Sequence, residues 1–170
     1  AKTLLKSAKT KEEKMYYIDH LANNFYSTLF RQSLFAEFEY DIHKAYENGE
    51  SVTAESMNKM YMNLNKKYFG KDVTLLDELQ YEWSRIPHFY TSFYVYKYAT
   101  GIICALAIAN KILSGEKDAV KNYKTFLSSG CKSDPVSLLK IAGADLTGST
   151  TFENAFKFIS SILDEWEKLI

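Results

Sequence analysis

The feature that most constrains this chain is its shortage of helix breakers, since 170 residues contain only 2 prolines and 7 glycines. Proline removes a backbone donor and glycine raises the entropic cost of ordering the chain, so long stretches without either favour long helices. A chain of this length can bury one sizeable core. We therefore expect an all-α, multi-helix bundle in which residues 1–170 form a single helical domain.

Apolar periodicity, capping residues and breakers place the expected helices along the chain. The predicted helical ranges are 10–48 as one long or two joined helices, 53–70, 74–84, 89–113, 116–127, a short helix from 135, and 150 to the end. Capping boxes are predicted at Thr10 with Glu13 and at Thr150 with Glu153. The stretch 93–98 is rich in strand-forming residues, but a lone strand would have no partner, so helix is preferred there.

Charge and hydropathy exclude two classes of partner. The 21 basic residues balance 21 acidic ones, which leaves no overall electrostatic footprint for nucleic acid. No stretch approaches the roughly 20 apolar residues of a membrane span, and residues 1–9 lack the apolar core that a signal peptide has. Cys104 and Cys131 match no metal or redox spacing, so we expect free thiols in a reducing cytoplasm. The chain also lacks an initiating Met, as expected of an excised piece of a longer protein.

Motifs for metal or nucleophilic catalysis are missing. The three histidines are His20, His43 and His88, and none lies in a His-Glu-x-x-His pattern. Glu39 and His43 are four residues apart on one helix face, but the further carboxylates of a di-iron bundle are absent. We interpret them as a surface or helix-stabilising pair. Gly-x-Ser-x-Gly and glycine-rich phosphate loops do not occur either.

The aromatic stretch 86–101 stands out instead. On a helix, Tyr94 and Tyr98 lie one turn apart on one face, whereas Tyr96 points away. His88, held just upstream by Pro87, would lean over the same groove. An imidazole and two phenols would then offer hydrogen bonds to one polar target. The alternative is that these side chains are ordinary core or rim aromatics with their hydroxyls in water.

Three segments together resemble one known family. They are residues 30–39 (Phe-Arg-Gln-Ser-Leu-Phe-Ala-Glu-Phe-Glu), the stretch 86–101 with its Ile-Pro-His-Phe-Tyr start, and residues 138–145 (Leu-Leu-Lys-Ile-Ala-Gly-Ala-Asp). They resemble the C-terminal region of oligoendopeptidase F, in the thimet-oligopeptidase-like zinc metallopeptidases. The resemblance implies the C-terminal part of a larger, zincin-type helical peptidase, cytoplasmic, which hydrolyses internal bonds of short oligopeptides.

The resemblance also implies what this chain lacks. The family's zinc ligands, two histidines of His-Glu-x-x-His and a later glutamate, and its general base lie upstream of the position that resembles Leu4. We therefore expect zinc in the parent enzyme but none bound by this chain, and no hydrolysis by the chain alone. Expected partners are the oligopeptide substrate and the missing N-terminal part of the peptidase. We also expect self-association through the exposed docking face.

Residue by residue, the resemblance carries over the substrate-binding and oxyanion wall of the cleft. His88 matches the family's histidine, and Tyr94 and Tyr98 best match its tyrosines. Tyr90 and Tyr96 are held in reserve, because relatives space these tyrosines differently. The alternative function is a free-standing helical peptide-binding or scaffolding module whose aromatic groove holds a peptide or partner helix.

Overall fold

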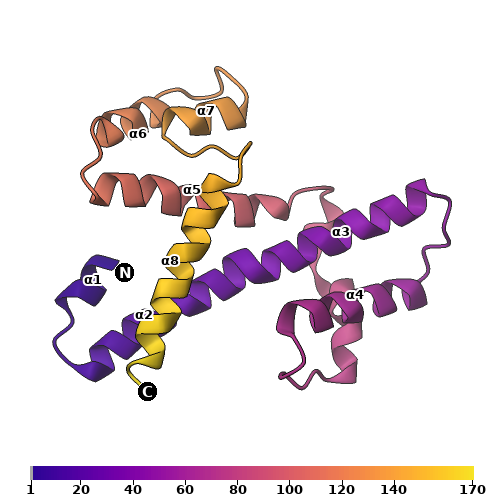
Figure 1. Cartoon of the computed structure of the whole chain (residues 1–170). Helices are drawn as coiled ribbons and strands as arrows, with labels where there is room; N and C mark the ends of the chain where they lie inside the picture. Colours follow the sequence, from indigo (N-terminus) through magenta and orange to yellow (C-terminus); the bar gives the residue numbers. More distant parts are fainter. Residues whose placement is uncertain (1) are drawn as a thin grey trace. The chain divides into compact units, whose positions relative to one another are not determined.

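The structure is a computed structural model that describes residues 2–170, and these residues form helices and no strand (Figure 1). The elements in order are α1 Lys2–Ser7, α2 Lys11–Phe25, the π-helix η1 Tyr26–Phe30, α3 Arg31–Glu47, α4 Ala54–Phe69, the 3₁₀ helices η2 Asp77–Arg85 and η3 Pro87–Tyr90, α5 Tyr96–Leu113, α6 Ala119–Leu127, α7 Pro135–Ile141 and α8 Thr150–Glu167. The predicted all-α class is confirmed. The chain divides into two compact units, one made of the residues up to Leu29 with Thr100–Ile170, the other of Phe30–Ala99.

The long N-terminal helical stretch begins at the capping box predicted from the sequence. Thr10 Oγ1 accepts a hydrogen bond from the Glu13 N–H at 3.1 Å, and the Glu13 carboxylate accepts one from the Thr10 N–H at 3.4 Å. Helical turns then continue through η1 to Glu47, with Gly49 at φ 78° just beyond the end. The expected pair of joined helices is thus present.

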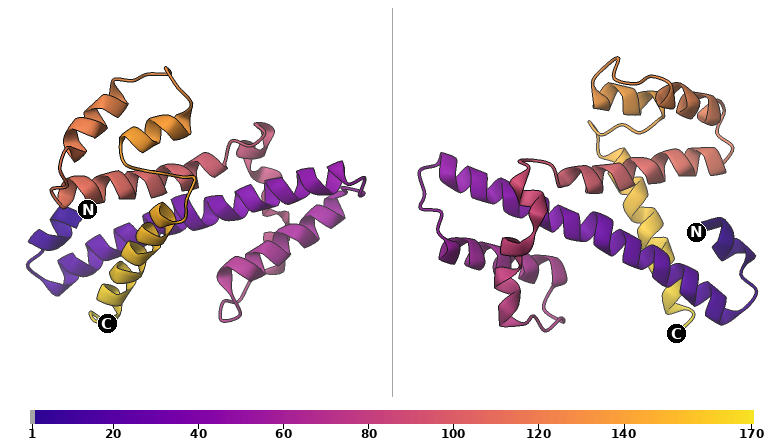
Figure 2. Two further views of the ribbon diagram at one scale, coloured as in Figure 1. Left: turned by 45° about the horizontal axis from the view of Figure 1, so that its top comes forward. Right: turned by 180° about the vertical axis from the view of Figure 1, so that it is seen from behind.

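In the first unit, α2 packs on α8, and both views in Figure 2 show these two helices side by side. Phe25 is buried and meets the Phe158 ring edge-on, with centroids 6.1 Å apart. Helix α1 contacts α2, and α6 contacts α7. A separate small core in this unit consists of Cys104, Ile108, Ala142 and Ala144.

The second unit places α3 against α4 and η2 against α4. Its core consists of Leu34, Phe35, Phe38, Tyr61, Leu64, Ile86 and Val95. The Glu82 carboxylate on η2 accepts hydrogen bonds from Tyr61 Oη at 2.7 Å and from Arg31 and Arg85, each at 2.6 Å. Because Tyr61 lies on α4 and Arg31 on α3, Glu82 ties three elements together.

The structure differs from the predicted helices in four places. The predicted helix 74–84 is the 3₁₀ helix η2, and α1 was not predicted. The Thr150–Glu153 capping box is wrong, because Thr150 is the first helical residue and Ser149 before it makes no side-chain cap hydrogen bond. Helix α5 begins at Tyr96 rather than near residue 89.

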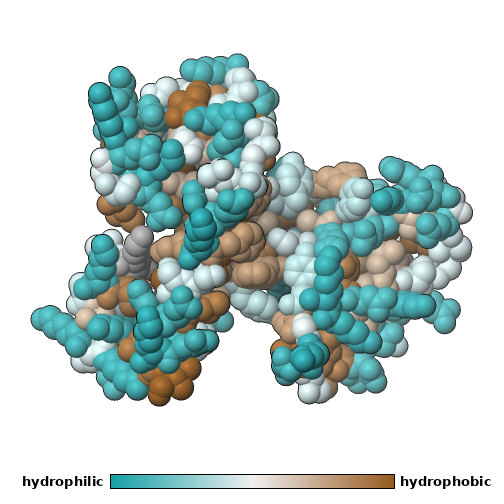
Figure 3. Space-filling model, in the orientation of Figure 1, coloured by the Kyte–Doolittle hydropathy of each residue, from teal (hydrophilic) through white to brown (hydrophobic). Residues whose placement is uncertain are grey.

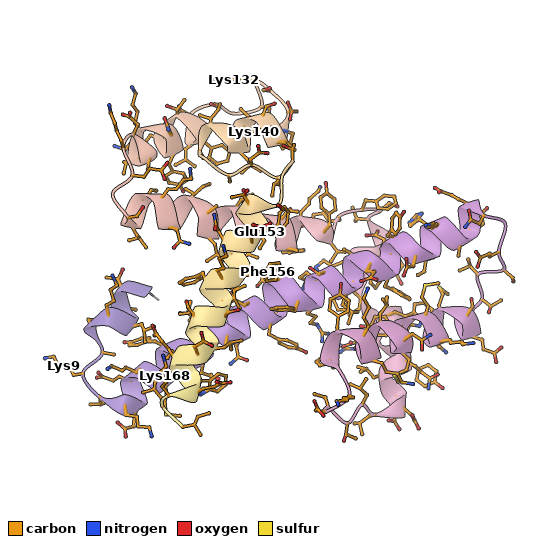
Figure 4. The ribbon with its side chains drawn as sticks, viewed as in Figure 1. Lys9, Lys132, Lys140, Glu153, Phe156 and Lys168 are labelled. Carbon is orange, nitrogen blue, oxygen red and sulfur yellow. The ribbon has the colours of Figure 1, made fainter. Side chains whose placement is uncertain are left out.

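Hydrophilic and hydrophobic residues are interspersed over the visible face (Figure 3). On α8, Phe156, which Figure 4 labels, is 44% exposed, and Leu163 is exposed to the same extent. Within residues 2–170 we find no helix both long and apolar enough to cross a membrane.

Candidate functional site

The site lies in Phe30–Ala99, on the segment that runs from η3 into the first turn of α5. Ile86 has an extended backbone, with φ −89° and ψ 106°, as expected of a residue that precedes proline. Pro87 then opens η3, which carries His88. Ile86 and Val95 are 7% and 0% exposed, so core packing fixes the segment at both ends.

The structure brings together the three residues that the sequence singled out. Tyr98 Oη lies 3.3 Å from His88 Nε2 and 3.3 Å from Tyr94 Oη. The His88 and Tyr94 rings are nearly parallel with centroids 6.1 Å apart, and the Tyr98 ring stands edge-on to both. All three side chains are half-buried. The predicted convergence of an imidazole and two phenols is therefore present in the geometry.

The contacts indicate which group donates each hydrogen bond in this cluster. His88 Nδ1 is buried and has no hydrogen-bond partner among the described residues. A proton there would be a buried donor without an acceptor, so we assign the ring N–H to Nε2, which donates to Tyr98. Tyr98 in turn donates to Tyr94. Each hydroxyl has one proton, so Tyr94 keeps its own proton to donate to a ligand.

Electrostatics favour a donor role for Tyr98. The hydrogen bond to Tyr94, together with burial, raises the pKa of Tyr98, so this hydroxyl remains protonated at neutral pH. Lys97 Nζ lies 5.2 Å from the centre of the Tyr94 ring. A cation at this position favours negative charge on an oxygen bound nearby.

The two reserve tyrosines, Tyr90 and Tyr96, are more exposed than Tyr94 and Tyr98. Tyr90, at the end of η3, is 87% exposed, and Tyr96, the first residue of α5, is 46% exposed. Neither residue is part of the cluster of His88, Tyr94 and Tyr98 described above. The structure thus groups the preferred pair of tyrosines with the histidine.

Tyr94 reaches Tyr98 from a turn rather than from the expected helix. Phe93 has φ 53°, a left-handed conformation that interrupts a helix and is uncommon for a bulky residue. The Glu39 carboxylate on α3 accepts a hydrogen bond from the Phe93 N–H at 2.7 Å. The Tyr94 carbonyl then accepts from the Lys97 N–H at 3.2 Å, a tight turn that starts α5.

Glu39 and His43 are not the surface or helix-stabilising pair that the spacing suggested. Glu39 is only 5% exposed, and the His43 ring lies against the Phe93 ring, tilted by 36°, with centroids 4.6 Å apart. Both residues therefore hold the segment that carries Tyr94. The available sequence signal was an acid placed among the apolar residues Phe35, Phe38 and Ile42 of one helix.

The residues present do not fit a metal centre. Across residues 2–170, no three His, Cys, Asp or Glu side chains are grouped closely enough to hold an ion. A catalytic zinc needs three protein ligands.

Residues 1–158 match the sequence profile of Peptidase family M3. The chain belongs to peptidase family M3. It is 42% identical to oligopeptidase PepF of Bacillus subtilis (strain 168), over 98% of this chain and 25% of the relative. It is 40% identical to the chromosomal oligoendopeptidase F of Lactococcus lactis subsp. cremoris, over 99% of this chain and 28% of the relative.

A solved structure gives the same result for the fold. The crystal structure of oligoendopeptidase-F from Enterococcus faecium matches with a TM-score of 0.96 and 40% sequence identity, over 99% of this chain and 32% of that one. The resemblance seen in the sequence is confirmed, as is the helical peptidase fold. The chain spans about a quarter to a third of the length of these M3 relatives.

Proposed function

We propose that this chain is the C-terminal part of an M3 oligoendopeptidase and forms the wall of its cleft that binds the substrate backbone and the oxyanion. The observation that carries the proposal is the convergence of His88, Tyr94 and Tyr98, with Tyr98 Oη 3.3 Å from both its neighbours. Membership of family M3 supports peptide hydrolysis as the chemistry.

In this proposal, Tyr94 donates its hydroxyl proton to the carbonyl oxygen of the scissile peptide. Negative charge builds on that oxygen as the carbonyl is attacked, and a preorganised donor contributes roughly 3–4 kcal/mol of transition-state stabilisation. Tyr98 and His88 orient Tyr94 through the donor chain and take part in binding the substrate backbone. The half-buried setting strengthens these hydrogen bonds relative to bulk water.

The remaining parts of the enzyme are proposed to come from outside this chain. They are the zinc ligands and the general base, both supplied by an N-terminal part of the peptidase that docks on these helices. We propose short oligopeptides as substrates and the cytoplasm as location.

The test is Tyr94→Phe in the full-length peptidase that carries this chain, assayed with a fluorogenic oligopeptide. Loss of an oxyanion donor is expected to lower kcat by about 100- to 1000-fold, with KM changed less than about threefold. Tyr90→Phe is the matched control, because Tyr90 is 87% exposed, and it should leave kcat unchanged.

An unchanged kcat in Tyr94→Phe would remove Tyr94 from the oxyanion role. A large loss in Tyr90→Phe instead would move that role to the exposed tyrosine. Binding of oligopeptides by the full-length protein without any hydrolysis would favour the alternative function, a helical peptide-binding module.

A further inference from the structure

The residue directly before Tyr94 has an unusual backbone. Phe93 and Asp118 are the two non-glycine residues with positive φ among residues 2–170, at 53° and 61°. Asp and Asn adopt this conformation fairly often, whereas a bulky aromatic residue rarely does. A conformation of this kind persists only where surrounding contacts hold it.

Two side chains of α3 supply those contacts. The Glu39 carboxylate accepts the Phe93 N–H at 2.7 Å, a short hydrogen bond to a charged acceptor. One helical turn further on, the His43 ring lies against the Phe93 ring at 4.6 Å and 36°. The backbone and the ring of Phe93 are thus each held by one residue of the same helix face.

Glu39 is unusual among the charged residues of α3. Glu37 contacts Lys67 and Tyr68, and Arg31 contacts Glu82, so these two pair with other side chains. Glu39 is 5% exposed, and its partner is a backbone amide. Burial of a carboxylate is costly unless it is paired, and an apolar residue would fill this position of a core helix without that cost.

The position of Tyr94 depends on the Phe93 backbone. Ile86 and Val95 are buried and fix the segment on either side. If the Phe93 N–H lost its acceptor, the Phe93 backbone would relax toward negative φ. Because Ile86 and Val95 are held in the core, this backbone change would move Tyr94, which lies between them. Tyr94 Oη would then leave its position 3.3 Å from Tyr98 Oη.

We infer that Glu39 is a positioning residue, which places the Tyr94 hydroxyl for catalysis by holding Phe93 in its left-handed conformation. This inference rests on the proposed function, because it gives Glu39 a role only through the donor at Tyr94. His43 assists by holding the Phe93 ring. Neither residue touches substrate in this scheme.

The test uses the full-length peptidase with three variants. Glu39→Leu removes the acceptor and is expected to lower kcat at least about tenfold with KM nearly unchanged, since small misplacements of a catalytic group cost 10- to 100-fold. Glu39→Gln keeps an acceptor oxygen and should restore kcat to within about threefold of wild type. Glu37→Leu, on the same helix but facing Lys67, is the matched control and should leave kcat unchanged.

A double variant separates positioning from a general loss of structure. If Glu39 acts through Tyr94, Glu39→Leu should lower kcat by less than about threefold in a Tyr94→Phe background, because the interaction is already lost. The same large factor in both backgrounds would overturn the inference. If Tyr94→Phe itself has no effect, the proposed function fails; if only Glu39→Leu has none, this inference alone fails.

A second readout does not depend on turnover. In the metal-free protein, hydrogen exchange followed by mass spectrometry should show the Phe93 amide exchanging at least about tenfold faster in Glu39→Leu than in Glu39→Gln. Equal exchange would overturn the inference. Should Glu39→Leu not fold, Glu39→Asp withdraws the oxygens by one methylene and keeps the charge. It should lower kcat and speed exchange in the same way, and wild-type values for both would overturn the inference.

Discussion

Glu82 has one carboxylate on which three side chains converge, from α3, α4 and its own helix η2. Burial acts to raise the pKa of Glu82, but hydrogen bonds from Tyr61 and Arg31 and the nearby Arg85 charge outweigh it and leave the pKa below its ordinary value. Tyr61 responds in the opposite sense, since burial and the Glu82 hydrogen bond raise its pKa and keep it protonated.

The sign of the Glu82 effect predicts how stability changes with pH. A carboxyl group with a lowered pKa in the folded state stabilises that state above its unfolded pKa of about 4.3, and the contribution is lost as pH falls through the folded value. Glu82→Gln should therefore reduce the free energy of unfolding by about 1–2 kcal/mol at pH 7. Urea denaturation at pH 7 and at pH 3 measures the difference in free energy of unfolding between wild type and Glu82→Gln. This difference should shrink toward zero at pH 3. An equal penalty at both values would contradict the ion-pair origin.

At the level of single residues, spacing and the family resemblance predicted one cluster, and its geometry is present while its role stays a prediction. His88, Tyr94 and Tyr98 were chosen as hydrogen-bond donors, and the structure brings them together. Glu39 and Phe93 were missed, because a positive φ at a phenylalanine follows from tertiary contacts and leaves no mark in the local sequence. The hydrogen bond between buried Glu39 and the Phe93 amide, 54 residues away, likewise cannot be predicted from the spacing of residues along a helix.

At the level of the helices, two predicted capping boxes had opposite outcomes. Thr10 and Glu13 exchange hydrogen bonds at the start of α2, whereas Thr150 is already inside α8. The same pattern, Thr with Glu three residues on, therefore appears once as a cap and once as the first turn of a helix. Sequence alone does not decide which residue of the Ser-Thr-Thr run at 149–151 is the first residue of the helix.

This pair provides a matched experiment on helix capping. Thr10→Ala removes an N-cap acceptor and should lower the free energy of unfolding by about 1 kcal/mol. Thr150→Ala places a better helix former at an exposed first-turn position and should change it by less than about 0.5 kcal/mol. Urea denaturation of both variants measures the difference. A loss of stability in Thr150→Ala as large as that in Thr10→Ala would show that the second box forms after all.

The boundaries of α5 show why helix limits were harder to predict than helix positions. Pro87 interrupts the helical pattern as expected. The next α-helix, α5, begins only at Tyr96, because the Phe93 N–H donates its hydrogen bond to Glu39 instead of to a helical carbonyl. By contrast, the start of α7 at Pro135 after the Asp134 cap follows from local chemistry, and it was predicted correctly. A helix end that depends on neighbouring residues can be predicted from the sequence, whereas a helix end that depends on contacts with distant residues cannot.

At the scale of the whole molecule, the chain accounts for about a quarter to a third of the M3 relatives and yet reproduces one solved structure closely. The match to oligoendopeptidase-F from Enterococcus faecium has a TM-score of 0.96 at 40% identity. Exposed apolar side chains such as Phe156 and Leu163 on α8 and Leu127 on α6 fit the proposal that further parts of a peptidase cover these helices.

This chain and the rest of a peptidase are expected to supply different parts of the catalytic site. The described residues offer a donor cluster but no group of three metal ligands, so the chain alone with added zinc should not hydrolyse a fluorogenic oligopeptide above background. Replacing the corresponding part of the Enterococcus faecium enzyme with this chain should give a hybrid active within about tenfold of its parent, because a chain with nearly the same backbone should pack against the rest of that enzyme and present the His88, Tyr94 and Tyr98 cluster to its cleft. In that hybrid, Tyr94→Phe should lower kcat as in the full-length protein. If the isolated chain hydrolysed the peptide at nearly the rate of the hybrid, all the groups needed for hydrolysis would have to lie within this chain.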